Sequence, residues 1–303
     1  MDEAFAPAGA IDKAALKALS RRSDAKGLAQ LAGHAAALGT TGVLVAQTAG
    51  SVWIVPALLV HGFVLIFLFA PLHETIHRTA FRSRRLNDAV AWLCGAVLVL
   101  PPEYFRAFHF AHHRYTQDPA RDPELLVPKP VTLAQYLVQV SGFVYWRRQI
   151  GSLLRHAAGR VDEGFISARL HGVIVREART MLLVYGGVMA GSLLLGTWAA
   201  VQYWIVPVLL GQPALRMYLL AEHTGCPHVP DMLRNSRTTH TTWALRRLAW
   251  NMPFHAEHHA YPALPFHALP AAHQQLKDRI TVQAPGYLTV QREIVANLGN
   301  RDA

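Results

Sequence analysis

The chain has 303 residues, of which 52% are hydrophobic and 16% are charged, and its formal net charge at pH 7 is +10. Soluble globular proteins carry about 25% charged residues, so this composition argues against a soluble domain. The positive charge would also suit a nucleic-acid-binding protein, but the arginines flank apolar segments instead of forming one basic patch. We therefore expect membrane lipid, and no nucleic acid, as the partner of this charge.

Two long segments contain no charged residue at all, from Gly27 to His73 and from Thr180 to Leu215. One spanning helix needs roughly 20 apolar residues. Each segment is therefore long enough for a helical hairpin that crosses the membrane and returns, at about residues 28–70 and 181–222. The predicted fold class is an all-α membrane protein with four transmembrane helices in two hairpins.

The segments outside the hairpins are rich in arginine on the side where both hairpins begin and end. The positive-inside rule then places both termini in the cytoplasm. We expect one domain, residues 1–303, with a helical cytoplasmic cap built from about 73–178 and 223–303. Within the cap, 89–100 is predicted to be re-entrant or interfacial. Segment 131–155 is predicted to lie in the membrane interface, with a plain surface helix as the alternative. The Ala- and Arg-rich composition favours a bacterial inner membrane.

Eight of the 17 histidines fall into three clusters, HETIH, HFAHH and HAEHH. In a helix, residues three and four positions apart share a face, so each cluster points its imidazoles in one direction. Imidazole is a ligand for zinc, copper, iron and nickel. Eight imidazoles are too many for one four-coordinate ion, so the clusters predict a site for two metal ions. The eight residues are His73, His77, His109, His112, His113, His255, His258 and His259.

Taken alone, HETIH is the motif in which two histidines hold zinc and Glu74 is the general base of a protease. An intramembrane zinc metalloprotease would leave six clustered histidines without a role. A metal-binding transporter would need polar groups near the midplane of the spanning helices, where the first hairpin offers only His61. Both functions are remote alternatives.

The three histidine boxes together, with hydrophobic hairpins before the first and the third, resemble the integral-membrane fatty acid desaturase/hydroxylase superfamily over about residues 30–275. The strings HHRYTQDPARDPE, from His112, and WNMPFHAEHHAYPALPFHALP, from Trp250, are similar to its desaturase branch. The resemblance implies a non-haem di-iron centre that uses O2 as co-substrate to introduce a double bond into a fatty acyl or lipid substrate. A lipid hydroxylase, or a fatty acid decarboxylase that forms a terminal alkene, is the alternative on the same scaffold.

The resemblance also implies a ninth histidine ligand at the cytoplasmic end of the last spanning helix. His223 occupies that place, and His228 and His240 are alternatives. Metal-bound histidines usually donate their other N–H to a carboxylate or carbonyl, and the resemblance suggests that Asn251 faces a metal through water. The candidates for such supporting roles are Asp118, Asp122, Glu124, Glu222, Glu257 and Asn251.

The source of electrons lies outside this chain, because the sequence contains neither a haem-binding HPGG motif nor a flavin or nicotinamide fingerprint. We expect a separate donor of the ferredoxin, rubredoxin or cytochrome b5 type. Arg106, Arg114, Arg147 and Arg148 are candidates to meet an acidic donor or an anionic substrate head group. The alternative is that they reflect only the positive-inside charge.

Overall fold

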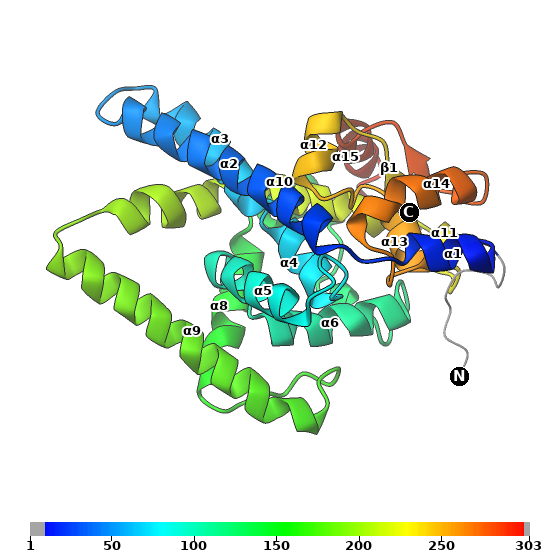
Figure 1. Ribbon diagram of the computed structural model, residues 1–303, viewed down its shortest axis with the longest axis horizontal. Helices are drawn as coiled ribbons and strands as arrows, with labels where there is room; N and C mark the ends of the chain where they lie inside the picture. The colour runs from blue at the N-terminus through cyan, green and yellow to red at the C-terminus, as the bar shows by residue number, and fades with distance from the viewer. Residues whose placement is uncertain (1–9, 300–303) are drawn as a thin grey trace.

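The computed structural model describes residues 10–299, which form a helical protein with one two-stranded parallel sheet (Figure 1). The helices are Lys13–Leu19 (α1), Asp24–Thr48 (α2), Ile54–Ile66 (α3), Phe69–Ile76 (α4), Arg84–Leu98 (α5), Pro102–Tyr115 (α6), Pro123–Leu126 (η1), Leu133–Val140 (α7), Phe143–Ala157 (α8), Ala168–Leu194 (α9), Val201–Ile205 (η2), Val206–His223 (α10), Met232–Asn235 (α11), Trp243–Leu248 (α12), His255–Ala260 (α13), Phe266–Ala268 (η3), Leu269–Leu276 (α14) and Tyr287–Ala296 (α15). The strands are Thr238–Thr239 (β1) and Gln283–Ala284 (β2).

Three helical segments are long and apolar enough to cross a membrane: Asp24–Thr48, Ile54–Ile76 and Val201–His223. A fourth candidate is the pair α5 and α6, which bends by 96° between Leu98 and Pro102 and is either a broken span or a re-entrant loop. The helix α9, which we expected to span, is not among the candidates. Its uncharged part begins only at Thr180 and ends at Leu194, so it is shorter than the roughly 20 residues that a span requires.

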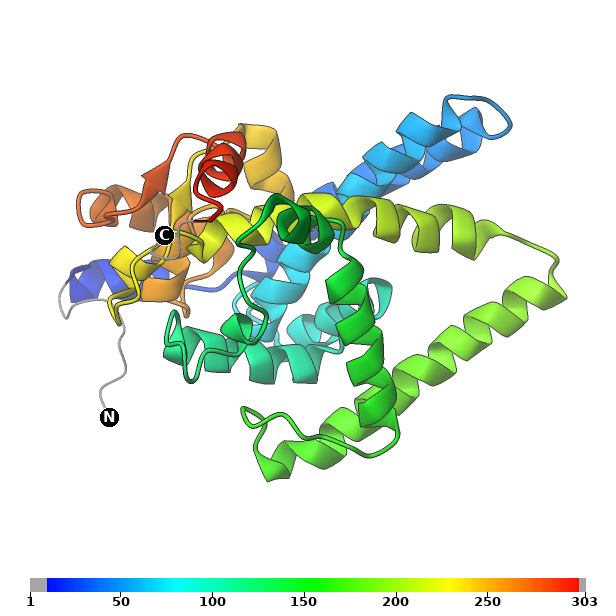
Figure 2. The same cartoon turned by 180° about the vertical axis from the view of Figure 1, so that it is seen from behind.

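The apolar helices project to one side of the molecule. The α2–α3 hairpin and the turn from α9 to η2 extend in the same direction, while α1 and the helices from α11 to α15 gather at the opposite end (Figures 1 and 2). Large apolar side chains are exposed at both tips, including Trp53 at 67%, Leu194 at 87% and Trp198 at 77%. Large exposed apolar patches are rare in soluble proteins, so these tips fit a lipid environment and a multi-pass membrane protein.

The spanning helices α3 and α10 pack together so closely that only glycine fits at the crossing. A Cβ atom added to Gly211 would lie 2.2 Å from the carbonyl oxygen of Gly62, and one added to Gly62 would lie 2.4 Å from the carbonyl oxygen of Pro207. Small residues allow this kind of backbone approach between membrane helices. The helix α9 instead diverges from α10 (Figure 2), so the second expected hairpin is not a packed pair.

Gly211→Ala is expected to lower the free energy of unfolding by about 1–3 kcal/mol, because the added methyl group must push α3 and α10 apart. Gly187→Ala, in α9, is the matched control, since a Cβ there meets nothing within 4 Å. The measurement is the thermal unfolding midpoint of both variants in detergent. Equal midpoints for Gly211→Ala and the wild type would contradict the tight crossing.

The polar side chain inside the first hairpin is bonded on both sides. His61 Nδ1 lies 2.8 Å from Thr41 Oγ1, and its Nε2 lies 3.1 Å from the carbonyl oxygen of Tyr203. His61 therefore joins α2, α3 and η2. The polar group on which the transporter alternative depends is thus accounted for by helix packing.

The two segments expected near the interface are both interrupted helices. Residue Val99, between α5 and α6, adopts the left-handed conformation at φ +55°, which turns the chain back at this point. The segment 131–155 is divided into α7 and α8 at Gly142, whose φ is +79°. Leu133, Leu137 and Phe143 are exposed there, as an interfacial position would require.

Candidate metal centre

All nine predicted histidine ligands lie where α4, α6, α10 and α13 meet. The first box lies on α4 and directly after it, the second on the last turns of α6, and the third on α13, while His223 is the last residue of α10. All of them are buried except His77, which is half-buried. Four helix segments that are distant in the sequence thus bring their imidazoles to one volume.

The histidines form two adjacent groups. In the first group, five ring nitrogens lie within 4.8 Å of one another, and its members are His73, His77, His109, His113 and His258. The second group contains His112, His223 and His259. His255 joins this second group, because its Nε2 lies 2.9 Å from Nε2 of His223.

The contacts between ring nitrogens fit shared metal ions better than hydrogen bonds. Nε2 of His113 is approached by Nε2 of His109 at 2.9 Å and of His258 at 3.1 Å. Nε2 of His223 is approached in the same way by His112 at 3.2 Å and His255 at 2.9 Å. A ring nitrogen has one N–H or one lone pair, so it cannot bond to both neighbours. Two nitrogens each about 2.1 Å from one metal ion, at right angles, would lie about 3 Å apart.

The imidazoles in the third box are held in the neutral form that binds metals. Burial lowers the pKa of His255, His258 and His259 well below the usual value, and repulsion from neighbouring histidines lowers it further. A neutral imidazole offers a free lone pair, whereas an imidazolium offers none. Nδ1 of His258 and Nε2 of His259 also have no hydrogen-bond partner among the described residues. The two groups are therefore able to bind metal ions.

Four of these histidines have a partner for the ring nitrogen that faces away from Nε2 of the other histidines, or a polar group near it. Nδ1 of His112 lies 2.9 Å from Asp122 Oδ1 and 3.2 Å from Glu124 Oε2. Nδ1 of His223 lies 3.1 Å from the carbonyl oxygen of Asn235. The corresponding contacts are Thr116 Oγ1 with Nδ1 of His259 at 3.2 Å, and Glu222 Oε1 with Nδ1 of His255 at 3.4 Å.

Asp122 is the predicted supporting carboxylate that the structure places beside a box histidine most directly. Its Oδ1 also accepts from the backbone N–H of Glu124 at 2.9 Å, and its Oδ2 accepts from that of Gln117 at 2.8 Å. Metal-bound histidines are commonly oriented by such contacts. Sequence reasoning missed Thr116 and Asn235, because a hydroxyl and a backbone carbonyl leave no distinctive pattern.

The other supporting candidates have different partners. Asp118 lies on the surface, where its Oδ2 accepts from Arg121 Nε at 2.7 Å. Glu257 accepts from Thr238 Oγ1 at 2.6 Å and is hydrogen-bonded to His273. Asn251 donates to the carbonyl oxygen of Phe266 at 3.1 Å. Within residues 10–299, none of the three side chains is hydrogen-bonded to a box histidine, so their predicted roles at the metals gain no support.

The alternative ninth ligands lie outside both groups. His240 is exposed, and its Nε2 lies 3.1 Å from Gln283 Oε1. His228 is exposed in the loop after α10. The end of α10 is fixed by its packing on α3, and this carries His223 to the other histidines.

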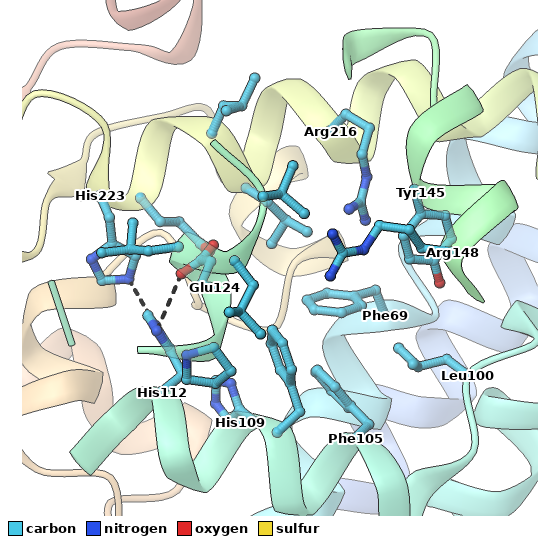
Figure 3. Close-up of a pocket in the computed structure, with 18 of the residues that line it drawn as sticks. Phe69, Leu100, Phe105, His109, His112, Glu124, Tyr145, Arg148, Arg216 and His223 are labelled. Atoms are coloured by element: carbon cyan, nitrogen blue, oxygen red, sulfur yellow. Dashed lines mark hydrogen bonds and ion pairs between the residues drawn. The ribbon is translucent and has the colours of Figure 1, made fainter. Parts of the chain in front are cut away.

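A pocket of about 440 Å³ begins at the histidines and extends toward α8 (Figure 3). His109, His112 and His223 line one end, while Arg148 and Arg216 line the other. The wall between them is largely apolar and includes Phe67, Phe69, Leu100, Phe105 and Tyr218. The shape and lining suit a molecule with an apolar chain, and the chain would pass the metal centre.

Of the four basic residues that we expected to face a partner, only Arg148 lines this pocket. Arg106 is instead occupied by Glu103, at 2.6 Å. The sequence-based prediction also omitted Arg216, which lies within a candidate spanning helix. A charged residue in such a segment is a signal for function, and it was hidden because it closes the uncharged run.

Comparison with known proteins agrees with the residues at this centre. The family model for fatty acid desaturases matches residues 50–291 of this chain. The chain belongs to the fatty acid desaturase family. It is 24% identical, over 74% of its length and 69% of the relative's, to the sn-1 oleoyl-lipid 12-desaturase of Picosynechococcus sp.. It is 27% identical, over 78% and 70%, to the dihydrorhizobitoxine desaturase of Bradyrhizobium elkanii. It is 26% identical, over 74% and 66%, to the sphingolipid delta(4)-desaturase of Drosophila melanogaster.

Membership of this desaturase family makes the chain an enzyme with a histidine-rich metal site, and it implies a fatty acyl or lipid substrate. It also overturns the protease alternative for HETIH. Glu74 is fully buried, and its Oε1 accepts the backbone N–H of Phe266 at 2.9 Å. The carboxylate therefore joins α4 to η3, as a structural acceptor beside the first box.

Proposed function

We propose that this desaturase-family protein is an O2-dependent di-iron oxidoreductase that introduces a double bond into a fatty acyl or lipid chain. One observation carries the proposal: nine histidines form two adjacent groups at the end of a largely apolar pocket. The two groups match the two metal ions that the number of histidines predicts. An apolar pocket leading to them suits a substrate that is oxidised at an unactivated C–H bond.

The chain's own residues divide the work at this centre. His73, His77, His109, His113 and His258 would hold one iron ion, and His112, His223, His255 and His259 would hold the other. Two bound iron ions supply the oxidation of a C–H bond, with O2 as co-substrate and electrons from a separate protein. Burial of the histidines excludes water from the reacting carbon, and the aromatic wall of the pocket holds the chain beside them.

The surroundings of the enzyme follow from the same proposal. The relatives named above act, by their names, on oleoyl-lipid, dihydrorhizobitoxine and sphingolipid, which supports an amphiphilic substrate here. The arginine-rich end that contains the metal centre would face the cytoplasm of a bacterium, with both termini on that side of the inner membrane. There it would receive electrons from a ferredoxin, a rubredoxin or a cytochrome b5 type of donor.

The test combines metal content with product analysis. Wild-type protein purified without chelator should contain about two iron ions per chain, and His112→Ala should lose a large part of them. With an added electron donor, a desaturase keeps the chain length and adds one double bond. A hydroxylase adds oxygen, and a decarboxylase removes one carbon. About one zinc ion per chain, retained by His112→Ala and lost from His77→Ala, would reject the di-iron proposal.

A further inference from the structure

The end of the pocket away from the histidines contains two guanidinium groups without a carboxylate partner. Arg216 from α10 and Arg148 from α8 both point into the pocket (Figure 3). Arg216 Nε donates to Gln212 Oε1 at 3.0 Å, and its guanidinium lies 4.3 Å from the centre of the Tyr145 ring. Over residues 10–299, neither guanidinium has an Asp or Glu oxygen within 4.0 Å. The two groups are thus positioned but electrostatically unpaired.

The carboxylates of the pocket lie at its opposite end. Glu124 and Glu222 are beside His112 and His255, at 3.2 and 3.4 Å from their Nδ1 atoms. The remaining arginine of the lining, Arg155, already faces Glu163 at 3.4 Å. The pocket therefore has one end that repels an anion and one end that attracts it, which fixes the direction in which an anionic ligand would bind.

A guanidinium group in an apolar pocket is costly unless an anion accompanies it. The group presents parallel N–H donors that match the two oxygens of a carboxylate or of a phosphate. Tyr145 stacks against Arg216 and Gln212 holds its Nε, so the remaining guanidinium donors stay available to a ligand. These contacts prepare the group for an oxyanion before it arrives.

The same helix links the cations to the metal centre. Arg216 precedes His223 by seven residues on α10, which corresponds to about 10 Å along the helix axis. Phe69, Leu100 and Phe105 line the space between the two ends (Figure 3). A ligand that reaches both ends therefore has an oxyanion at one end and an apolar chain that passes the histidines.

We propose that Arg216 and Arg148 bind the anionic head of the substrate, a carboxylate, inside the pocket. The reacting carbon is then selected by its distance from that head. The inference about the reacting carbon rests on the proposed function, whereas the binding of the head group can be measured without turnover. The same guanidinium groups would also accept a phosphate head, so the experiment includes both anions.

The test measures binding of dodecanoate, of its methyl ester and of dodecyl phosphate to purified protein by calorimetry. The wild type should bind dodecanoate at least tenfold more tightly than the uncharged ester. Arg216→Gln and Arg148→Gln should each lose most of this preference, and Arg216→Lys should keep part of it. Arg147→Gln is the matched control, because Arg147 is adjacent on α8 but is exposed and outside the pocket lining.

The outcomes separate this inference from the proposed function. Equal binding of acid and ester by the wild type, or an equal loss in Arg147→Gln, would reject the anion site even if the protein holds iron. Iron content that is unchanged in Arg216→Gln would show that the variant is folded. Tighter binding of dodecyl phosphate than of dodecanoate would support the anion site and assign it to a phosphate head. With fatty acids of several lengths, a double bond at a constant distance from the methyl end would reject selection from the head.

Discussion

Replacing His223 by alanine is expected to remove one of two bound iron ions, because this residue is central to the four-histidine group. Its Nε2 lies 3.2 Å from that of His112 and 2.9 Å from that of His255. The five-histidine group is formed without it. The measurement is elemental analysis of purified protein, with iron falling from about two ions to about one per chain, and with loss of desaturation.

The matched control for this prediction is His228→Ala. His228 follows His223 in the chain but is exposed and belongs to neither group, so its loss should leave iron and activity at wild-type levels. Full iron content in His223→Ala would contradict the assignment of the second group. An equal loss in both variants would mean that the loop after α10, and not the imidazole, determines metal binding.

The sequence was sufficient to predict the metal-binding histidines as a set, because helical spacing decides the local direction of side chains. It did not predict how they divide. Within the second box, His109 and His113 belong to the first group, while His112 faces His223 in the second. A helix turns about 100° per residue, so residues four apart point together and the residue beside them points elsewhere. The partner of each direction depends on tertiary packing, which spacing alone cannot give.

The fold was predictable to a similar depth. The uncharged runs identified the regions of α2, α3 and α10, because the length of an apolar run reflects the thickness of a bilayer. They did not reveal that α10 packs on α3 through Gly62 and Gly211. That contact joins residues far apart in the chain, and only the shape of both helix surfaces determines it.

The choice among supporting carboxylates shows the same limit. Asp118 and Asp122 both precede a proline and both cap a turn in the chain. Only Asp122 is buried against His112, whereas Asp118 pairs with Arg121 on the surface. Proximity in sequence to a histidine box therefore selects both residues, and the direction of the chain after α6 separates them.

Asp122→Asn is expected to weaken metal binding by about 10- to 100-fold, the usual effect of losing a carboxylate behind a ligand histidine. Asp122 Oδ1 lies within hydrogen-bonding distance of Nδ1 of His112 and accepts from the backbone N–H of Glu124, and Oδ2 accepts from that of Gln117. Both oxygens are thus acceptors. An amide NH2 group in either position would face a donor, so at least one contact must be lost.

The geometry of Asp122 also predicts which property changes. The carboxylate accepts the Nδ1–H of His112, and this leaves the lone pair on Nε2, the nitrogen that points to His223. Asparagine weakens that selection of tautomer without creating a cavity. Titration with a chelator should therefore remove iron from Asp122→Asn at lower concentration, while the thermal unfolding of the metal-free protein changes little. Asp118→Asn, on the surface, should behave as the wild type. If both variants release iron alike, the buried Asp122–His112 contact does not orient the ligand, and the two aspartates act only through the charge of their shared turn.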